Sequence, residues 1–379
     1  MELPFLTDSP RDRLSQVRVK AQPDDFIVEE IPLYLPSGRG DHAYFWIEKR
    51  GVSTHDAARQ LAGALGKRPN DAGVAGLKDA QAVTRQWISF EHVAPERAEQ
   101  LELGPALRVL AVQRHGNKLR MGHLKGNRFR IRLRLGQPPA AASPAPPLPP
   151  APAELTDAAR ALFAELSRRG VPNYYGPQRF GRGSRNPSLG RCLVQAAEAA
   201  FCEGLKAAGI RPSRARDRRF RNLMVNAFQA DLFNRVLARR LDRFGTLLPG
   251  DLAWLHRNGA VFKVEDPAKE QPRCDAFEIS PSGPLFGPKM PLPEGEPGRL
   301  EREVLAGSGV TVEDFGRREA ERQPGARRPL RVLFLEEPDV RTDEAGVVLS
   351  FALPSGSYAT VVLRELVGDG PLEEAPGDA

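Results

Sequence analysis

The sequence predicts a mixed α/β fold in which one sheet-containing domain is interrupted by an insertion. Segments 26–31 and 44–49, close to the amino terminus, are rich in β-branched and aromatic residues, which is typical of strands. Helical periodicity dominates the middle of the chain, and alternating apolar residues return at 347–353. Strands at both ends with helices between them therefore indicate one α/β domain whose two parts are separated in the sequence.

We expect the first part of this domain at 1–167, the insertion at 168–325, and the second part with an acidic tail at 326–379. A chain of 379 residues suits two domains, because a domain usually contains roughly 100–200 residues. Segment 138–153 is dominated by proline and alanine, which predicts an extended connector without helix or strand. The tail from Gly368 is acidic and rich in glycine and proline, so we expect it to fray.

Local patterns predict three amphipathic helices. The first begins at Thr54, with Ser53 or Thr54 as its cap; the second runs from Thr156 to Gly170; the third covers 222–244. A further strand is expected over the apolar run 330–335, and a helix over 358–366. At 128–134, apolar residues alternate with arginines, which predicts a strand with one buried face and one arginine-lined face.

Positive charge is concentrated in two stretches of a chain with a net charge of +7. Between Glu102 and Glu154 there is no acidic residue, and the cationic residues are Arg108, Arg114, Lys118, Arg120, Lys125, Arg128, Arg130, Arg132 and Arg134. The second stretch contains Arg211, Arg214, Arg216, Arg218, Arg219 and Arg221. Such patches favour phosphate contacts, and the arginine face of the 128–134 strand is a candidate phosphate track. Charge alone is equally compatible with a solvated surface.

The rest of the composition points to a cytoplasmic protein without a metal centre. The three cysteines lack CxxC spacing, and an odd number suits a reducing compartment better than a disulfide scaffold. No apolar run is long enough to span a bilayer, and the amino terminus lacks a signal pattern. The six histidines form no metal-like cluster in the sequence.

Asp79 lies in the most informative segment, 76–86. The apolar run 74–77 stops at Lys78 and Asp79, and the alternation that follows predicts strand, tight loop and strand. The segment is not a Walker loop, because the glycine, lysine and hydroxyl order is missing. A carboxylate held in such a loop could attack or stabilise an electron-poor carbon such as a sugar C1′. A lysine and aspartate at a turn are structural in most proteins, and adjacency does not show whether Lys78 reaches Asp79.

Other candidates each have two interpretations. Phe26 follows a turn at a strand start and is either a core side chain, which is preferred, or a stacking surface for a base. Asn127 either caps a turn or orients a carboxylate or a base edge. The loop 172–181, with Arg179 and Phe180, combines aromatics, amides, arginine and glycines, which suits either an RNA-gripping loop or a tightly packed structural one.

Together these motifs resemble the TruD family of tRNA pseudouridine synthases over roughly residues 22–367. The strongest is Gly-Leu-Lys-Asp-Ala-Gln-Ala-Val-Thr-Arg-Gln at 76–86. The others, in the order of the family, are the segments 25–30, 117–120 with 126–129, 171–176 with 178–181, 281–287 and 354–360. One such match is weak evidence, but several in the same order are hard to produce by chance.

The resemblance implies an isomerase that converts uridine, in bacteria uridine 13, to pseudouridine in tRNA without metal or organic cofactor. It implies a mainly antiparallel sheet domain with an inserted TruD-specific domain, RNA held between the two, and tRNA as the partner of a monomeric enzyme. Asp79 would be the essential carboxylate, and Lys78, Phe26 and Asn127 would line its pocket. Tyr358 stands where many bacterial relatives carry phenylalanine, and a stacking role survives that change. Arg179 and Phe180 would contact RNA.

Two alternatives stay open alongside this function. A non-catalytic RNA-binding or chaperone protein would use the same basic surface, although the intact Lys78 and Asp79 argue against it. A glycoside hydrolase would need a second carboxylate roughly 5–9.5 Å from the first, and no partner stands out. Within the leading function, Asp79 either adds to C1′ or removes the C2′ proton, and the sequence does not separate the two.

Overall fold

The computed structural model describes residues 3–9, 11–14, 16–101, 103–135, 150–316 and 323–373. The chain forms two compact units. Unit 1 comprises Met1–Asp8, Leu166–Leu333 and Thr360–Val362, and unit 2 comprises Ser9–Glu165, Phe334–Ala359 and Leu363–Ala379. The division into domains at 1–167, 168–325 and 326–379 stays a prediction, because a compact unit need not be a domain that folds alone.

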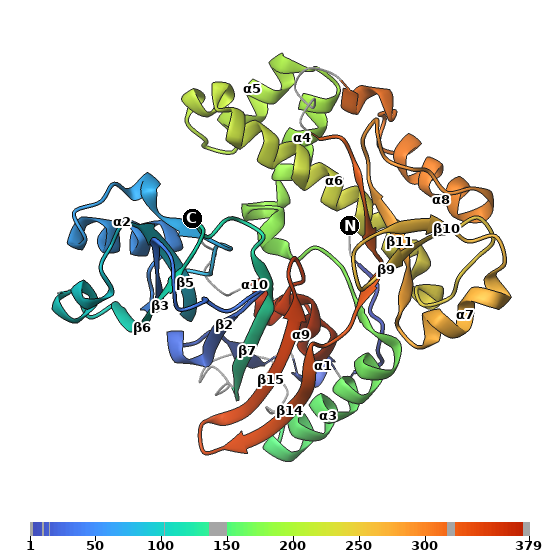
Figure 1. Cartoon of the computed structure of the whole chain (residues 1–379). Helices are drawn as coiled ribbons and strands as arrows, with labels where there is room; N and C mark the ends of the chain where they lie inside the picture. Colours follow the sequence, from blue (N-terminus) through green and yellow to red (C-terminus); the bar gives the residue numbers. More distant parts are fainter. Residues whose placement is uncertain are drawn as a thin grey trace. The chain divides into compact units, whose positions relative to one another are not determined.

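Unit 2 is built on a sheet with the strand order β14-β15-β7-β2-β5-β3-β6 (Figure 1). Strand β1 pairs with β7, and β4 pairs with β5. Strands β2 and β5 run parallel, and the other pairs of this sheet are antiparallel. The predicted α/β fold with a mainly antiparallel sheet is therefore confirmed. The strands are β1 (Val17–Val19), β2 (Phe26–Pro32), β3 (His42–Arg50), β4 (Gly73–Val74), β5 (Val83–Glu91), β6 (Leu107–His115), β7 (Leu124–Leu135), β14 (Glu336–Asp343) and β15 (Gly346–Pro354).

Strand β7 has the predicted alternation, and three of the four arginines on its other face, Arg128, Arg132 and Arg134, form ion pairs. Phe129, Ile131 and Leu133 are buried, as expected for the core face. On the other face Arg128 pairs with Glu29 and Glu336, Arg132 with Asp343, and Arg134 with Asp25. These arginines therefore form ion pairs with carboxylates of β2, β14 and the turn before β2, while Arg130 is exposed. The phosphate track stays a prediction, and sequence alternation does not show which acidic residues the sheet places opposite.

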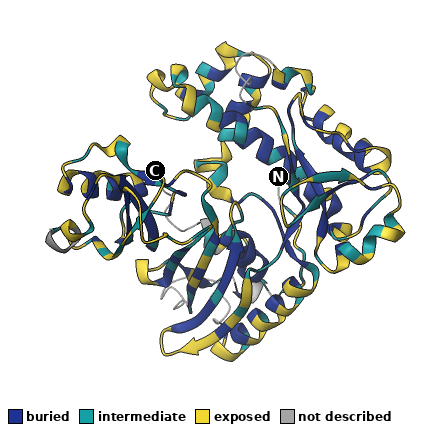
Figure 2. Ribbon diagram, in the orientation of Figure 1, coloured by how far each residue is buried: buried dark blue, intermediate teal, exposed yellow. Residues whose placement is uncertain are grey.

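Helix α2 (Thr54–Ala64) covers one end of the sheet beside β3 and β5 (Figure 1). Ser53 caps it by accepting a hydrogen bond from the N–H of Asp56, which confirms the predicted start. Its buried side packs Ala57, Ala58, Leu61 and Ala62 against a core that includes Phe45, Ile88 and Phe90. Figure 2 shows that burial is concentrated in the strands beneath the helix, while its outer side is exposed.

Helix α3 (Pro152–Arg169) begins earlier than predicted, inside the proline-rich segment. Proline is tolerated in the first turn of a helix, where its missing N–H would have no intrahelical partner. The helix ends before Gly170, whose φ of 90° suits glycine, as expected. The rest of the expected connector, 138–149, lies outside the described residues. The other helices of this part of the chain are α1 (Arg11–Leu14), α9 (Ala359–Val367) and α10 (Gly370–Glu373).

The two predictions for the end of the chain had different outcomes. Helix α9 confirms the helix expected over 358–366. The short helix α10 lies where the tail was expected to fray, so that expectation was wrong for Gly370–Glu373. Residues 374–379 lie outside the described part of the chain.

Unit 1 combines helices with a four-stranded sheet, order β10-β9-β11-β12, and a short pair of β13 with β8. Helix α6 starts before the predicted residue 222, because Asp217 caps it by accepting from the N–H groups of Arg219 and Phe220. The strand expected over 330–335 is much shorter. The elements are β8 (Val171–Pro172), α4 (Asn186–Val194), α5 (Glu198–Ala207), α6 (Arg218–Arg240), β9 (Leu252–Leu255), β10 (Val261–Lys263), α7 (Pro267–Asp275), β11 (Ile279–Leu285), α8 (Gly295–Ala306), β12 (Ala326–Pro329) and β13 (Arg331–Val332).

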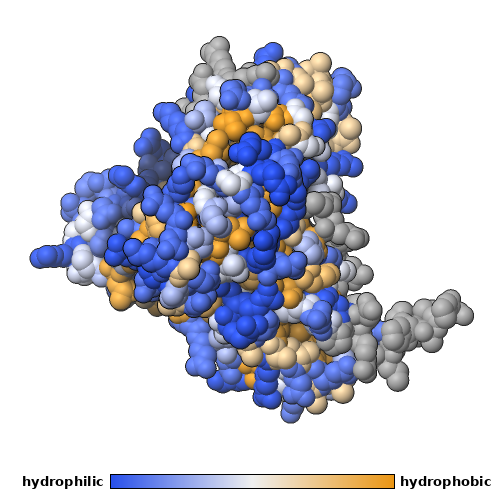
Figure 3. All heavy atoms as spheres, turned by 90° about the vertical axis from the view of Figure 1, so that its right-hand side faces the viewer, coloured by the Kyte–Doolittle hydropathy of each residue, from blue (hydrophilic) through white to orange (hydrophobic). Residues whose placement is uncertain are grey.

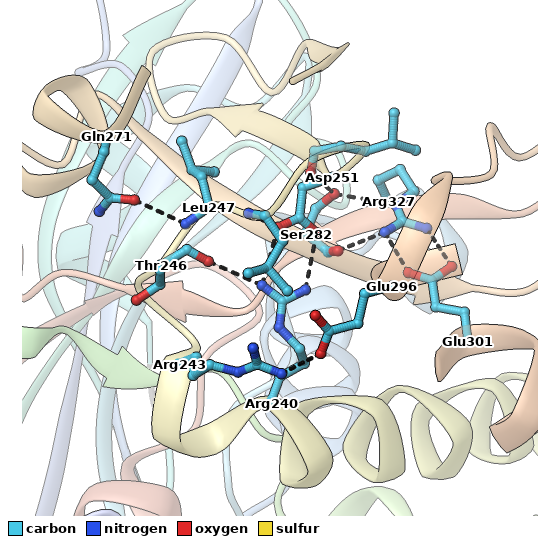
Figure 4. A network of polar contacts seen from close by, with 12 residues as sticks. Arg240, Arg243, Thr246, Leu247, Asp251, Gln271, Ser282, Glu296, Glu301 and Arg327 are labelled. Atoms are coloured by element: carbon cyan, nitrogen blue, oxygen red, sulfur yellow. Dashed lines mark hydrogen bonds and ion pairs between the residues drawn. The ribbon is translucent and has the colours of Figure 1, made fainter. Parts of the chain in front are cut away.

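Buried arginine–carboxylate pairs join the helices and strands of unit 1 (Figure 4). Arg240 of α6 binds Asp251 beside β9 at 2.9 Å, and Arg327 of β12 binds Glu301 of α8 at 2.7 Å. Arg327 also donates to Ser282 of β11. Both guanidinium groups are used bidentately, which satisfies charges that would otherwise be costly to bury. They therefore specify how these elements pack.

The face drawn in Figure 3 is mostly hydrophilic, with smaller hydrophobic groups between the polar side chains. In the described part of the chain, none of the helices has the length and apolar character needed to cross a lipid bilayer.

Candidate active site

Asp79 lies in the loop between β4 and β5 of unit 2, as the strand–loop–strand prediction requires. Strand β4 is shorter than expected, because the chain leaves it after Val74 and Leu77 is exposed in the loop. One carboxylate oxygen of Asp79 accepts a hydrogen bond from the N–H of Gln81 at 3.1 Å. The side chain is 23% exposed. It is therefore oriented by its own loop and still accessible from solvent.

The cation paired with Asp79 is Lys20, which the sequence analysis did not identify. Its ammonium binds Oδ2 of Asp79 and lies 4.4 Å from the centre of the Phe26 ring. Lys20 thus joins Asp79 to Phe26. Its backbone has a φ of 57°, a conformation that is uncommon for residues other than glycine. A lysine directly after a three-residue strand carries no signal in the sequence that could have revealed this role.

Lys78 pairs with Glu30 of β2. The distance between its Nζ and Oε2 of Glu30 is 3.0 Å, and the two side chains are 4% and 0% exposed. Burial raises the pKa of Glu30, and the charge of Lys78 opposes that rise. The ammonium of Lys78 was expected to line the pocket, but it is buried in this ion pair. The pair supports the loop from beneath, and the role of Lys78 in a substrate pocket stays a prediction.

A buried set of polar side chains holds the backbone of the Asp79 loop from beneath. The N–H of Lys78 donates to Oγ1 of Thr54 at 2.9 Å, and Thr54 in turn donates to Gln86, which donates to the carbonyl of Gly76. The ammonium of Lys49 donates to the carbonyl of Asp79 at 2.7 Å. Thr54 begins α2, Lys49 lies near the end of β3 and Gln86 belongs to β5. The loop is therefore fixed by three separate elements of the sheet unit.

Asn127 of β7 lies directly opposite Glu30 of β2 in the sheet register. Its side-chain oxygen is buried and has no hydrogen-bond partner in the described structure. Gly126 pairs with Pro354, and a Cβ at Gly126 would lie 2.2 Å from the carbonyl oxygen of Leu353, so the approach of β15 requires glycine here. Asn127 thus lies beside the buried Lys78–Glu30 pair, and among the described residues its side-chain oxygen has no hydrogen-bond donor.

Phe26 and Tyr358 also belong to the sheet unit. Phe26 is 4% exposed and contacts Phe129 edge to face, which supports the preferred interpretation of a core side chain. Tyr358 is half-buried and precedes α9, at the end of a turn whose Ser355 donates to the carbonyl of Lys125. That contact anchors the turn beside the start of β7, two residues before Asn127.

Arg179 and Phe180 belong to unit 1, whereas the Asp79 loop belongs to unit 2. Both are partly buried in a short helical turn after Tyr175. The guanidinium of Arg179 lies 5.6 Å from the centre of the Tyr175 ring, and Arg328 covers the same ring at 4.2 Å. The loop is therefore a compact arginine–aromatic cluster, and its contact with RNA stays a prediction.

Removing the Lys20 charge should impair turnover more than folding. We expect Lys20→Met to lower kcat by roughly 10- to 100-fold, because a hydrogen bond to a charged group contributes about 1.5–3 kcal/mol. Lys20→Arg should restore most of the lost rate while KM stays within about threefold. The reaction that the TruD resemblance implies is followed by steady-state kinetics of tritium release from tRNA labelled at uridine C5. Equal losses in both variants would show that the charge at this position is not what matters.

Comparisons with known proteins agree with the motifs gathered at this site. A family model described as tRNA pseudouridine synthase D (TruD) matches residues 10–208 and 210–366. The tRNA pseudouridine synthase D of Geobacter metallireducens is 43% identical over 93% of this chain and 95% of its own length. That of Anaeromyxobacter dehalogenans is 44% identical over 98% of this chain and 99% of its own. The chain belongs to the tRNA pseudouridine synthase D (TruD) family.

A solved structure supports the TruD fold as well. It is described as that of a tRNA pseudouridine synthase D from Methanosarcina mazei, with a TM-score of 0.76 over 98% of this chain and all of that chain. Its sequence identity is 24%, so the likeness concerns the fold alone. The TruD match at 10–208 includes Asp79 and Lys20, and all of the support beneath the loop.

Proposed function

We propose that this TruD-family protein isomerises uridine to pseudouridine in tRNA, at uridine 13, with Asp79 as the essential carboxylate. The observation that carries the proposal is the Asp79–Lys20 pair on a loop fixed by buried polar side chains. The family membership and the names of the curated relatives support the reaction and the substrate. An accessible carboxylate beside a cation is kept ionised, as a nucleophile or a base must be.

The reaction needs a carboxylate and no external reagent. The N1–C1′ bond breaks, the uracil turns, and a new bond forms between C5 and C1′. C5 then loses its proton and N1 gains one, so atoms and electrons balance without a redox cofactor or a metal. Asp79 acts either by adding to C1′ or by removing the C2′ proton. In both cases the carboxylate is required in its ionised form.

The arginines near the start of α6 are our candidate for RNA backbone contacts in unit 1. Arg214 pairs with Asp217 and Arg221 with Glu198, while Arg211, Arg216, Arg218 and Arg219 are exposed. Cations at a helix amino terminus are electrostatically unfavourable, because the positive end of the dipole lies there. An anionic partner such as RNA phosphate relieves that repulsion. Monomeric action in the cytoplasm, where Cys192, Cys202 and Cys274 would stay reduced, completes the proposal.

Tritium release decides whether the protein is an isomerase. A tRNA labelled with tritium at C5 of its uridines loses the label when C5 becomes bonded to C1′, whereas binding alone releases none. We expect release from a bacterial tRNA with uridine at position 13, and its loss when that position is cytidine. A protein that binds tRNA and releases no tritium would instead be the non-catalytic RNA-binding protein considered above.

The salt dependence of tRNA binding should show whether the arginines near the start of α6 contact RNA phosphates. We expect Arg216→Glu, Arg218→Glu and Arg219→Glu, combined in one variant, to weaken tRNA binding and to reduce the slope of log K against log salt by about 2. A variant with the same charge change at exposed Arg257, Lys269 and Arg302 is the control. Fluorescence anisotropy over a salt series measures both. An unaltered slope in the α6 variant would remove these arginines from the RNA interface.

A further inference from the structure

Four large apolar side chains are exposed on three loops of unit 2, one of which carries Asp79. Leu33 is 58% exposed, Leu35 75%, Leu77 57% and Met121 63%. We call these four residues the apolar rim. Leu77 precedes the buried Lys78 and the accessible Asp79 in the same loop. Isolated exposed leucines are common, but four such residues on three neighbouring loops, one of which carries the candidate carboxylate, need an explanation.

Hydrogen bonds join the three loops into one surface. The N–H of Gly122, next to Met121, donates to the carbonyl of Ala75 at 2.8 Å. The N–H of Leu33 donates to the carbonyl of His123 at 3.4 Å, and the hydroxyl of Tyr34 lies 2.7 Å from Nδ1 of His123. The loop that carries Met121 thus contacts both the Asp79 loop and the loop after β2. The apolar rim is therefore held in place rather than scattered.

The charge beside the apolar rim is positive. Arg120 precedes Met121, and Lys125 follows on the same stretch of chain; both side chains are exposed. An apolar surface with cations at its edge matches a nucleic acid, whose base faces are apolar and whose backbone is anionic. An acidic protein partner would satisfy the cations, but it would have no reason to lie at the candidate catalytic carboxylate.

We propose that the apolar rim packs against the bases that flank the target uridine, with Leu77 and Met121 occupying the space that the uridine leaves. The inference rests on the proposed function, since a uridine must leave the stack before its C1′ can meet Asp79. Extrusion exposes the faces of the neighbouring bases. Apolar side chains placed between base steps stabilise an unstacked duplex in other nucleic-acid complexes. The apolar rim supplies such side chains at the carboxylate that would receive the nucleotide.

Two experiments distinguish an effect on extrusion of the target uridine from an effect on tRNA binding or on the isomerisation itself. In single-turnover tritium release at saturating protein, the double variant Leu77→Ala and Met121→Ala should react about tenfold more slowly than wild type. Its Kd for tRNA should change less than about threefold. Leu110→Ala, at a 42% exposed leucine of β6 in the same unit, is the matched control and should leave both quantities unchanged.

A fluorescence measurement with the Asp79→Asn variant detects extrusion of the target uridine, because this variant should bind tRNA but should not convert the uridine. With 2-aminopurine next to the target uridine, fluorescence should rise on binding, and the rise should fall by at least half when Leu77→Ala and Met121→Ala are added. An unchanged single-turnover rate would overturn the inference. So would a slower rate with an undiminished fluorescence rise, since the two side chains would then act on the chemistry. Absence of tritium release from wild type would refute the proposed function instead, and the fluorescence measurement would still test the apolar rim.

Discussion

Asp79→Asn should lower kcat for pseudouridine formation by on the order of a thousandfold or more. The substitution keeps the size and shape of the side chain and removes its charge. Asparagine can still accept the hydrogen bond from Gln81, so the loop should keep its structure. It can neither add to C1′ as a carboxylate nor accept the C2′ proton. Affinity for tRNA should stay within about threefold, because a single neutralised acid contributes little to phosphate binding.

The matched control is Asp71→Asn in the same unit. Asp71 also accepts a hydrogen bond from a backbone N–H in a tight turn and pairs with a cation, Arg68, but it lies in the turn before β4. Its replacement should leave kcat unchanged. Tritium release gives kcat and filter binding gives Kd for both variants. An Asp79→Asn protein that retained a tenth or more of the wild-type rate would end the assignment of Asp79.

Lys78→Met should reduce the free energy of unfolding of unit 2 by about 3–5 kcal/mol, the usual effect of removing one member of a buried ion pair. Methionine fills much of the space of the lysine stem. The loss of stability should therefore come from the unpaired Glu30 and not from a cavity. Adding Glu30→Gln to Lys78→Met should recover a large part of the loss. Urea unfolding followed by tryptophan fluorescence measures it, because Trp46 and Trp87 lie in β3 and β5.

The loss should depend on pH in a defined direction. Burial already raises the pKa of Glu30 above its ordinary value of 4.5, and loss of the Lys78 charge removes an interaction that lowers it. The folded variant then binds a proton at Glu30 in a pH range where the unfolded chain does not. Its stability should therefore fall as the pH rises above about 4.5, and the difference from wild type should be smaller at pH 5 than at pH 8. A pH-independent difference would show that Glu30 stays ionised in the variant.

The support beneath the loop explains why one local motif can carry a reactive group. Lys49, Thr54 and Gln86 bind the backbone of residues 76–79 and leave the side chain of Asp79 accessible. Preorganised groups of this kind hold a catalytic side chain in place without a further ordering cost. In the part of the chain that the structure describes, the buried side-chain oxygen of Asn127 has no hydrogen-bond partner, and Asn127 lies opposite Glu30 in the sheet.

Features encoded in consecutive residues could be predicted from the sequence. The cap at Ser53, the alternation of β7 and the loop around Asp79 each depend on residues within one segment. Pairings between distant segments could not be predicted. Arg128 of β7 meets carboxylates of β2 and β14, and Lys78 meets Glu30. No local pattern states which side chains face one another across a sheet.

By itself, then, the sequence determined the α/β class, the family and the single acidic residue on which the chemistry is proposed to depend. Only the tertiary structure decided that Lys20, 59 positions away, is the cation of Asp79, and that Lys78 serves Glu30 instead. The physical reason is that ion pairs form between groups that strand register and loop closure bring together. Those distances are set by the whole sheet, whereas a motif records only neighbours along the chain.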